Sequence, residues 1–253
     1  MALLEGRRVF VTGAATGIGR ATAEYLAEQG ARVFGVGLDG GEGRSAYAGK
    51  APRLLFRETD LTREAEVQAA VAEASAAFGG LDGVVNCAGV YPTGKRLEEL
   101  TDTEWDGTIA VNLTAIFRVC RATLPLLRAA GGGAVVNIAS VHAVSTVPGV
   151  PAYAATKAAV VGLSRQMALD YAVDRIRVNS VLVGSVATRM TLDGLDEAGG
   201  AEAIGLTFRD NAVARIADPR EIATAIGFLL SEAASFVTGS ALLADGGLTA
   251  RLL

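Results

Sequence analysis

The chain has few of the side chains from which metal sites and disulfide frameworks are built. Its 253 residues include one histidine, two cysteines and one tryptophan. Cys87 and Cys120 are too few for a disulfide framework, and they lack the spacing of metal ligands. We therefore predict a reduced, cytoplasmic protein with no metal site.

Positive charge and long apolar runs are also scarce. Lys and Arg number 23 against 27 Asp and Glu, a formal net charge of −4, whereas binding nucleic acid without sequence preference requires a basic surface. No uninterrupted apolar run approaches the roughly 18 residues of a membrane-spanning helix. The N-terminal sequence MALLEGRRVF lacks the basic, apolar and small segments of a signal peptide. These absences predict no nucleic-acid partner and no membrane partner.

The chain is rich in glycine and in alternating secondary-structure patterns. Hydrophobic residues make up 51% of it, and 31 residues are glycine, which suits a large core joined by tight turns. β-rich segments such as RRVFVTG, DGVVNCAG and RIRVNSVLV alternate with helical patterns along the whole length. This alternation predicts an α/β fold with a doubly wound parallel sheet in three α/β/α layers. We expect residues 1–253 to form a single domain, with a mobile substrate loop at about 185–217, where the pattern is weakest.

Three helices have distinctive local signals. The segment TREAEVQAAVAEASAAFG places five apolar residues on one helical face: Val67, Ala70, Val71, Ala74 and Phe78. TDTE at 101–104 is a capping box, and DPRE at 218–221 combines an Asp cap, a first-turn Pro and a Glu at the third position. Each of these two segments predicts a helix start.

A glycine-rich turn follows the first predicted strand, in FVTGAATGIGRATAEYLAEQG. Gly13, Gly17 and Gly19 stand where a backbone turns sharply and approaches a phosphate closely, and the following helix offers free N–H groups and a positive dipole end. An isolated glycine spacing is often a plain turn. Here an apolar strand precedes it, and a helix and a second strand follow it, which is the context that a dinucleotide site requires.

Tyr153 and Lys157 lie one helical turn apart in a segment that is otherwise alanine-rich and apolar. Taken alone, the pair is accounted for by packing, with the tyrosine on the core and the lysine in water. Ser140 alone is equally well a turn residue at the end of a strand. The hypothesis that Tyr153, Lys157 and Ser140 are catalytic therefore depends on the other motifs of the chain.

Four motifs in this order resemble the short-chain dehydrogenase/reductase family: TGAATGIG at 12–19, NCAG at 86–89, Ser140, and YAATK at 153–157. The resemblance extends over essentially the whole chain, including the VTGSALLADGG ending. It implies a Rossmann-type seven-stranded sheet that binds NAD(H) or NADP(H). It also implies an active-site tetrad of Asn112, Ser140, Tyr153 and Lys157.

The tetrad gives Tyr153 a role in proton transfer. A free tyrosine has a pKa of about 10, and a lysine four residues on shares its helix face. We expect the lysine ammonium, with the positive ring of an oxidised nicotinamide, to lower that pKa. The resemblance implies that Lys157 also binds the nicotinamide ribose and that Ser140 donates to the substrate oxygen. It further implies that Asn112 holds a water linking Lys157 to solvent.

The resemblance also implies cofactor contacts, with Val186 and Thr188 beside the nicotinamide carboxamide. The implied cofactor-binding residues are Gly13, Thr16, Gly17, Ile18, Gly19, Asp39, Asp60, Leu61, Asn86, Ala88, Gly89, Tyr153, Lys157, Val186 and Thr188. The chain departs from the family where Cys87 replaces a usual Asn and Val183 a usual Pro. The lost proline is expected to loosen the loop that follows.

The choice of cofactor depends on the end of the second predicted strand. A carboxylate there binds the ribose hydroxyls and repels a 2′-phosphate, whereas an arginine attracts that phosphate. In NAD-using relatives the acid falls at the position of Gly37, and Asp39 lies two residues beyond it. NADP-using relatives often have a basic residue where Thr16 or Leu38 stands, and Arg44 is the nearest cation downstream. We therefore favour NAD(H) over NADP(H).

The predicted reaction interconverts an alcohol and a ketone of a small molecule, with Ser140, His142 and Tyr153 in contact with the substrate. The pocket is expected to form beyond the carboxyl ends of the strands, from residues 90–97, 141–151 and 185–212. A sugar or polyol, a 3-oxoacyl thioester and a cyclic ketone all remain open. The alternative function is a catalytically idle dinucleotide-binding sensor or scaffold, which has no use for an intact tetrad.

Two predicted helices, 151–172 and the one after Thr101, are apolar nearly all round. Such a helix must be covered on both sides, and the sheet covers only one of them. We therefore predict a homo-oligomer, and the resemblance implies a homotetramer.

Overall fold

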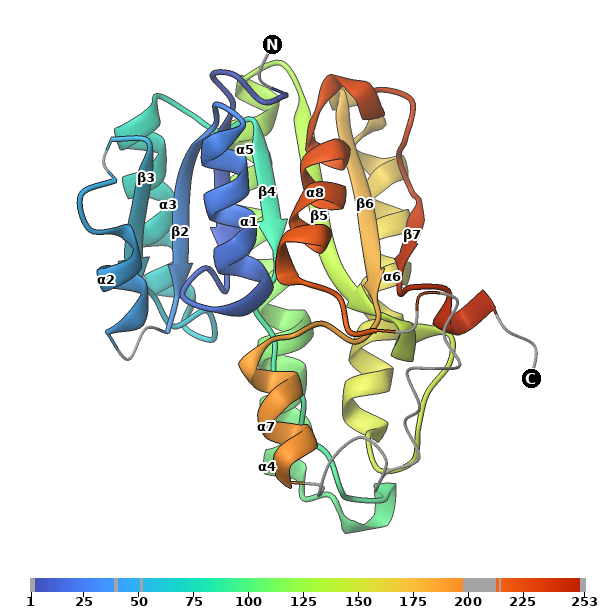
Figure 1. Cartoon of the computed structure of the whole chain (residues 1–253). Coiled ribbons are helices and arrows are strands. Elements are labelled where there is room, and N and C mark those ends of the chain that lie inside the picture. The colour runs from blue at the N-terminus through green and yellow to red at the C-terminus, as the bar shows by residue number, and fades with distance from the viewer. Residues whose placement is uncertain (1–2, 39–40, 51, 198–212, 214, 251–253) are drawn as a thin grey trace.

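The computed structural model describes residues 3–38, 41–50, 52–197, 213 and 215–250, and its centre is a parallel sheet of seven strands (Figure 1). The strands are β1 (Arg8–Thr12), β2 (Arg32–Gly37), β3 (Leu54–Glu58), β4 (Gly83–Asn86), β5 (Gly133–Ser140), β6 (Ile176–Val183) and β7 (Ala241–Ala244). Their order is β3-β2-β1-β4-β5-β6-β7, so the chain builds one half of the sheet outward from β1 and then returns to build the other half from β4. This confirms the predicted Rossmann-type doubly wound fold. Ligands of such sheets bind at the carboxyl ends of the strands where the order reverses, here β1 and β4.

Helices cover both faces of the sheet (Figure 1). One face carries α1 (Gly17–Glu28), α2 (Glu42–Tyr47) and α8 (Pro219–Leu230), and the other carries α3 (Glu64–Phe78), α5 (Ala115–Ala129) and α6 (Pro151–Asp170). Helices α4 (Asp102–Ile109) and α7 (Arg189–Glu197) extend beyond the carboxyl ends of the strands, at the bottom of Figure 1. Short turns of helix lie at Leu97–Glu99, Ala110–Thr114, Val141–Ala143, Ala172–Asp174, Glu232–Ala234 and Leu248–Ala250. The predicted capping boxes at Thr101 and Asp218 are both formed and begin α4 and α8.

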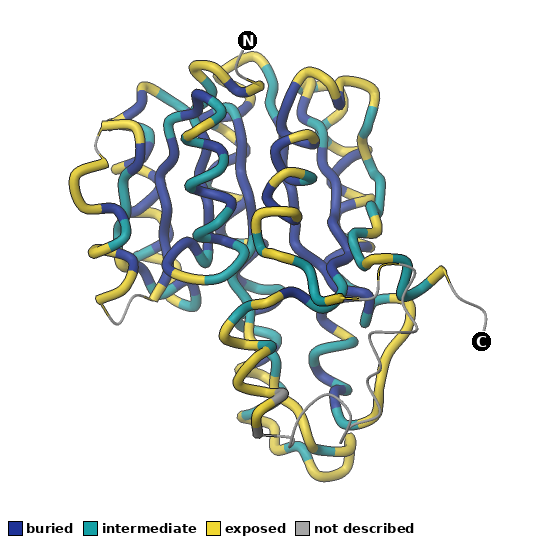
Figure 2. The backbone as a smooth tube through the Cα atoms, in the orientation of Figure 1, coloured by how far each residue is buried: buried dark blue, intermediate teal, exposed yellow. Residues whose placement is uncertain are grey.

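The central strands are buried on both faces (Figure 2). All four residues of β4 are buried, and Val9, Phe10 and Val11 of β1 have no exposed surface. Parallel strands covered by helices on both sides are expected to be continuous apolar runs of this kind.

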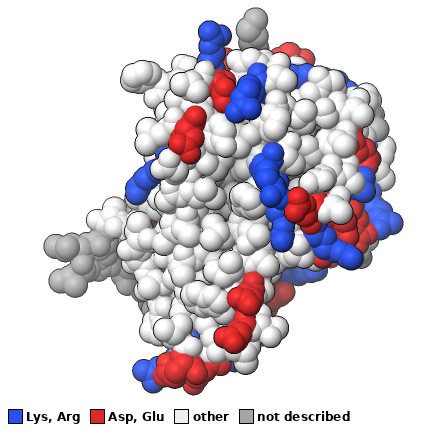
Figure 3. Space-filling view, turned by 180° about the vertical axis from the view of Figure 1, so that it is seen from behind, with Lys and Arg blue, Asp and Glu red and all other residues white. Residues whose placement is uncertain are grey.

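The outer surface of the layer formed by α3, α5 and α6 has a broad area without charged side chains (Figure 3). Phe117 of α5 is 50% exposed, and Leu169 of α6 is 75% exposed. A surface groove between these two helices is lined in part by Phe117, Leu124, Leu163 and Met167. The predicted outward-facing apolar side chains are therefore present on both helices.

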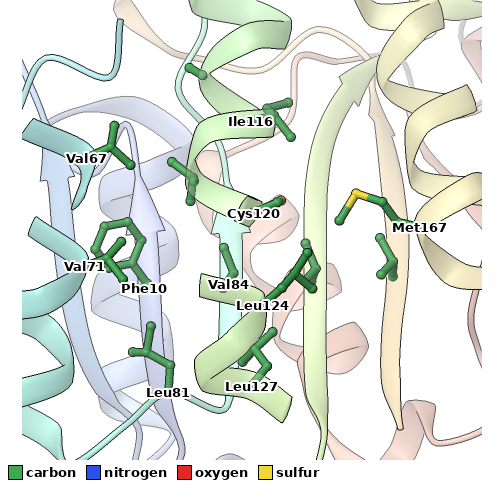
Figure 4. Packing of buried hydrophobic residues seen from close by; sticks show 14 of the residues in the cluster. Phe10, Val67, Val71, Leu81, Val84, Ile116, Cys120, Leu124, Leu127 and Met167 are labelled. Carbon is green, nitrogen blue, oxygen red and sulfur yellow. The ribbon is translucent and has the colours of Figure 1, made fainter. Parts of the chain in front are cut away.

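The core between this helix layer and the sheet is built from interlocking aliphatic and aromatic side chains (Figure 4). Phe10 and Phe34 stack with ring centroids 6.0 Å apart, and Phe78 meets Phe34 edge-on at 6.2 Å. The predicted apolar face of α3 is buried in full. Its packing holds α3 against β1 and β2.

Helices α4 and α5 are joined by a π-helical turn, Ala110–Thr114, into one stretch from Asp102 to Ala129. This stretch is long and apolar enough to cross a membrane by length and composition, although no uninterrupted apolar run of the sequence has that length. Within its most apolar window of 18 residues, 39% of the residues are buried. Ile116, Cys120 and Leu124 of α5 face the sheet (Figure 4), and core helices commonly pass the same test.

Candidate active site

The glycine turn between β1 and α1 is shaped by close backbone contacts. Gly13 and Gly17 have left-handed backbone conformations, with φ of 66° and 54°. A Cβ atom on Gly19 would lie 2.1 Å from the Gly13 carbonyl oxygen, and one on Gly13 would lie 2.8 Å from the Ala88 nitrogen. The Thr12 hydroxyl accepts hydrogen bonds from the Cys87 and Ala88 amides, at 2.9 and 3.1 Å. The turn is thereby fastened to the loop after β4, and α1 begins beside it.

A cleft of about 230 Å³ opens above this turn, at the carboxyl ends of β1, β4, β5 and β6. The cleft brings together most of the residues predicted for catalysis and cofactor binding: Gly13, Thr16, Gly17, Ile18, Gly19, Ala88, Gly89, Ser140, Tyr153, Lys157, Val186 and Thr188. A larger surface groove of about 680 Å³ lies between α3 and α5 and contains none of the predicted site residues. Among the described residues, no group of three or more His, Cys, Asp and Glu side chains could hold a metal ion.

Tyr153 and Lys157 project from the first turns of α6 into this cleft. Lys157 is 4% exposed, and its ammonium donates a hydrogen bond of 2.9 Å to the Ile138 carbonyl of β5 and lies 5.5 Å from the centre of the Tyr153 ring. The Tyr153 hydroxyl shares a hydrogen bond with Ser140. The pair is therefore part of a polar cluster that includes the end of β5, and the plain packing interpretation, with lysine in solvent, is wrong.

Burial controls the protonation of both side chains. It raises the pKa of Tyr153 to about 12, although the hydrogen bond with Ser140 acts in the opposite direction. It lowers the pKa of Lys157 to about 8, because an ammonium group loses its hydration in the interior. For the protein alone, burial sets the upward direction of the tyrosine pKa. The lowering expected from Lys157 together with an oxidised nicotinamide stays a prediction, and the ammonium donates its hydrogen bond to the Ile138 carbonyl.

Ser140 and Asn112 approach the pair from different elements. The Ser140 hydroxyl, at the end of β5, accepts from the His142 amide at 3.3 Å and donates to the Val183 carbonyl at 3.4 Å. Asn112 is fully buried in the π-helical turn, an element that often marks functional sites. Its amide group accepts from the Val90 nitrogen at 2.8 Å and donates to the Val90 carbonyl at 3.0 Å and the Thr156 hydroxyl at 3.2 Å. It thereby holds the loop after β4 against α6.

Gly89 leaves a small space next to these groups. A Cβ atom at this position would lie 3.3 Å from the Asn112 side-chain oxygen and 3.6 Å from the Lys157 ammonium nitrogen. Both polar atoms therefore border the same space at the edge of the cleft.

Three of the predicted cofactor-binding residues have side chains outside the cleft. Asn86 is buried in β4, where its amide donates to the Asn137 side chain of β5 at 2.8 Å. The Asp60 carboxylate accepts from the Thr62 amide and hydroxyl, which lowers its pKa, and Leu61 is buried in the core. Asp39 lies outside the described residues.

The segments around the end of β2 contain paired charges. Gly37 is in register with Glu58 of β3, and Glu58 forms an ion pair with Arg44 of α2. Glu42, also on α2, forms an ion pair of 2.8 Å with Arg189 at the start of α7. Carboxylates of two elements therefore lie near the predicted adenosine site.

The loop that follows β6 is tied to neighbouring segments. The Gly184 amide donates to the Ala244 carbonyl at 3.1 Å, and Val186 forms a parallel bridge with Ala217. The chain then enters α7 at Arg189. The rest of the predicted mobile loop, 198–212 and 214, lies outside the described residues.

Tyr91 lies beside Tyr153 but was not among the individual residues predicted for the site. Its ring centroid lies 4.5 Å from that of Tyr153 in an edge-to-face arrangement and 5.6 Å from that of His142. His142, a predicted substrate contact, lies 5.4 Å from Tyr153. Tyr91 belongs to the predicted pocket segment 90–97. Its position just after the NCAG motif was the feature of the sequence that could have indicated a place in the site.

Sequence and structure comparisons identify the relatives of this chain. A family described as enoyl-(acyl carrier protein) reductase matches residues 13–249. The 2,5-dichloro-2,5-cyclohexadiene-1,4-diol dehydrogenase of Sphingobium indicum is 38% identical, over 99% of this chain and 100% of that protein. D-threitol dehydrogenase of Mycolicibacterium smegmatis is 38% identical, over 97% of this chain and 94% of that protein. The crystal structure of levodione reductase superimposes with a TM-score of 0.91 at 33% identity, over 98% and 99% of the two chains. The chain therefore belongs to the short-chain dehydrogenase/reductase family of enzymes, oxidoreductases that act on CH–OH groups.

Proposed function

We propose that this protein is an NAD(H)-dependent oxidoreductase that interconverts a secondary alcohol and a ketone, with Tyr153 as general acid and base. The observation that carries the proposal is the cluster at the start of α6. There Ser140, Tyr153 and Lys157 line one cleft, and the buried Lys157 ammonium lies 5.5 Å from the centre of the tyrosine ring.

The residues of the cleft fit a dinucleotide. Gly13, Gly17 and Gly19 form a turn without side chains, in front of the first amides of α1, where a pyrophosphate is favourably bound. Val186 and Thr188 line the opposite side, where the family binds the nicotinamide. The bound cofactor supplies or accepts the hydride.

Tyr153 handles the proton of the reaction. With a pKa of about 12, the hydroxyl is protonated at neutral pH and is ready to donate to a ketone oxygen. In alcohol oxidation it has to accept that proton, and the nearby Lys157 charge favours this. With a pKa of about 8, Lys157 is still mostly protonated at neutral pH. Ser140 donates a hydrogen bond to the reacting oxygen and stabilises its developing charge.

Asn112 completes a path for the proton. The space beside Gly89, bordered by the Asn112 oxygen and the Lys157 nitrogen, suits a water molecule that relays a proton from the lysine to solvent. Asn112 is itself held by the Val90 backbone and Thr156, so its orientation is maintained.

The charges near the end of β2 favour NAD(H) over NADP(H). Glu58 and Glu42 lie on the elements that flank this end, and they neutralise Arg44 and Arg189. Each of these two cations is matched by a carboxylate, so neither ion pair offers a net positive charge to a 2′-phosphate. Asp39 remains the predicted partner of the ribose hydroxyls.

The partner of the site is a small alcohol or ketone. The relatives named above include dehydrogenases of a cyclic diol and of D-threitol, so both ring and polyol substrates are within the range of the family. We further propose a cytoplasmic homotetramer with neither nucleic acid nor membrane as a partner. The exposed Phe117 and Leu169, on the groove-forming helices α5 and α6, support association of subunits.

The test is Tyr153→Phe, assayed with a panel of secondary alcohols and NAD⁺ by the absorbance of reduced nicotinamide. The variant keeps the ring and loses the proton-exchanging hydroxyl, so kcat should fall by about 10²–10⁴-fold or more while cofactor affinity is retained. Wild-type turnover in this variant would refute the role of Tyr153. If the wild type binds cofactor tightly but oxidises no alcohol, the alternative of a catalytically idle sensor holds.

A further inference from the structure

Two aromatic side chains outside the predicted tetrad surround the catalytic tyrosine. Tyr91, from the loop after β4, meets the Tyr153 ring edge-to-face at 4.5 Å, and His142, from the turn after β5, meets it at 5.4 Å. The two rings are 5.6 Å from each other. We call the rings of Tyr91 and His142 the aromatic wall.

The aromatic wall is uncharged. The His142 ring is half-buried, and burial lowers its pKa, so the imidazole is neutral at neutral pH. Its Nδ1 atom is hydrogen-bonded to the Thr146 hydroxyl at 2.9 Å. Tyr91 is also half-buried, and burial raises its pKa, so its phenol is neutral too.

The segments that carry the wall contain few charged side chains. Residues 141–151 contain no charged side chain, and residues 90–97 contain Lys95 and Arg96. Lys95 forms an ion pair with Glu104, and Arg96 one with Glu98 at 3.6 Å. Exposed apolar side chains are instead found on these segments and at the start of α7: Val90, Val144, Val147, Met190 and Leu192.

We infer that the aromatic wall selects a carbocyclic secondary alcohol or ketone, whose ring packs against Tyr91 and His142 while its oxygen lies at Tyr153 and Ser140. This inference rests on the proposed function and names the substrate class of that site. A saturated ring presents a compact C–H surface to aromatic faces and loses little conformational entropy on binding. An extended polyol presents hydroxyl groups rather than a continuous C–H surface to the aromatic wall. The phosphate of a carrier thioester needs a cation, and the two cations of these segments are each paired with a glutamate.

The experiment compares cyclohexanol with 2-hexanol, two secondary alcohols of equal carbon number, in the wild type and in Tyr91→Ala. The readout is the ratio of their kcat/KM values, because the ratio cancels general damage to the enzyme. We expect the wild type to prefer the ring roughly tenfold or more, and Tyr91→Ala to lower that ratio by roughly 10-fold. Sorbitol, tested in the same way, should be a poorer substrate than cyclohexanol.

Two further variants separate the wall from simpler explanations. Tyr91→Phe keeps the ring and loses only the hydroxyl, so it should retain the preference for cyclohexanol. His142→Ala should lower the ratio, as Tyr91→Ala does. A ring preference that survives both alanine variants would come from the rigidity of the substrate alone and would overturn the inference. A wild type that prefers 2-hexanol or sorbitol would also overturn it while leaving the proposed function intact, whereas a wild type that oxidises no alcohol would refute the proposed function itself.

Discussion

Lys157→Met is expected to make the protein more stable and nearly inactive. The lysine ammonium is buried at the base of the site, and its only hydrogen bond among the described residues is to the Ile138 carbonyl. Methionine has a similar length and no charge, so it removes the ammonium that is proposed to bind the cofactor ribose and to support Tyr153. Turnover should fall by about 10²–10⁴-fold.

The gain in stability follows from the depressed pKa of the lysine. A pKa that falls from 10.5 to about 8 means that holding the charged form in the folded protein costs about 3 kcal/mol relative to the neutral form. Loss of the hydrogen bond to Ile138 offsets about 1 to 2 kcal/mol of this. The variant should therefore be more stable than the wild type by about 1 to 2 kcal/mol at neutral pH.

The sign of the pH dependence gives a sharper test. The unfolded chain holds the lysine proton up to about pH 10.5, whereas the folded protein releases it near pH 8, so the wild type gains stability as the pH rises through this window. The Lys157→Met variant has no ammonium at this position, so its stability does not rise in this way with pH. Between pH 7 and pH 10.5 the difference in free energy of unfolding should change by about 3 kcal/mol in favour of the wild type, so the variant's advantage at pH 7 should reverse; urea unfolding measures it. Tyr153 and Cys120, whose pKa values burial raises to about 12, are present in both proteins and cancel in the difference.

The control is Lys50→Met, at an exposed lysine paired with Glu24. The free energy of unfolding of Lys50→Met should stay within about 0.5 kcal/mol of that of the wild type at both pH values. A Lys157→Met protein that is less stable than the wild type by the same amount at both pH values would refute the reasoning, because the lysine would then not be buried at a cost.

Four further predictions address other parts of the molecule. Gly19→Ala forces a Cβ atom to within 2.1 Å of the Gly13 carbonyl oxygen and should abolish cofactor binding in a fluorescence titration, whereas Gly107→Ala, with nothing within 4 Å, should leave binding unchanged. Alcohol oxidation should accelerate as the pH rises from about 6 to 9, because Tyr153 must lose its proton, while ketone reduction should not accelerate over this range; a faster reduction at high pH would contradict the assignment. Light scattering should give a tetramer mass at micromolar concentration, and a monomer mass would exclude the association proposed for α5 and α6. The wild type should have a higher kcat/KM with NAD⁺ than with NADP⁺, and Asp39→Ala should narrow the gap; a wild-type preference for NADP⁺ would overturn the cofactor assignment.

The sequence by itself determined the fold class, the helix starts and the identity of the tetrad candidates. The fold class and the helix starts depend on residues that are close together in the chain, whereas the tetrad candidates were implied by the resemblance of four motifs to a known family. Alternating patterns decide which segments become strands or helices, and Thr101 and Asp218 cap helices through residues only two or three positions away. Tyr153 and Lys157 share a face because α6 has a fixed number of residues per turn. Local geometry therefore sufficed for the fold class, the helix starts and the shared face of Tyr153 and Lys157.

The surroundings of the tetrad were decided by the tertiary structure. Tyr91 meets Tyr153 through the placement of the loop after β4 beside α6, and Asn86 turns to Asn137 because β4 and β5 pair in that register. The pKa of Lys157 falls because strand and helix side chains from many parts of the chain exclude water from it. Contacts and desolvation of this kind depend on residues that are distant in the chain and meet only in the folded protein, so no local pattern in the sequence contains them.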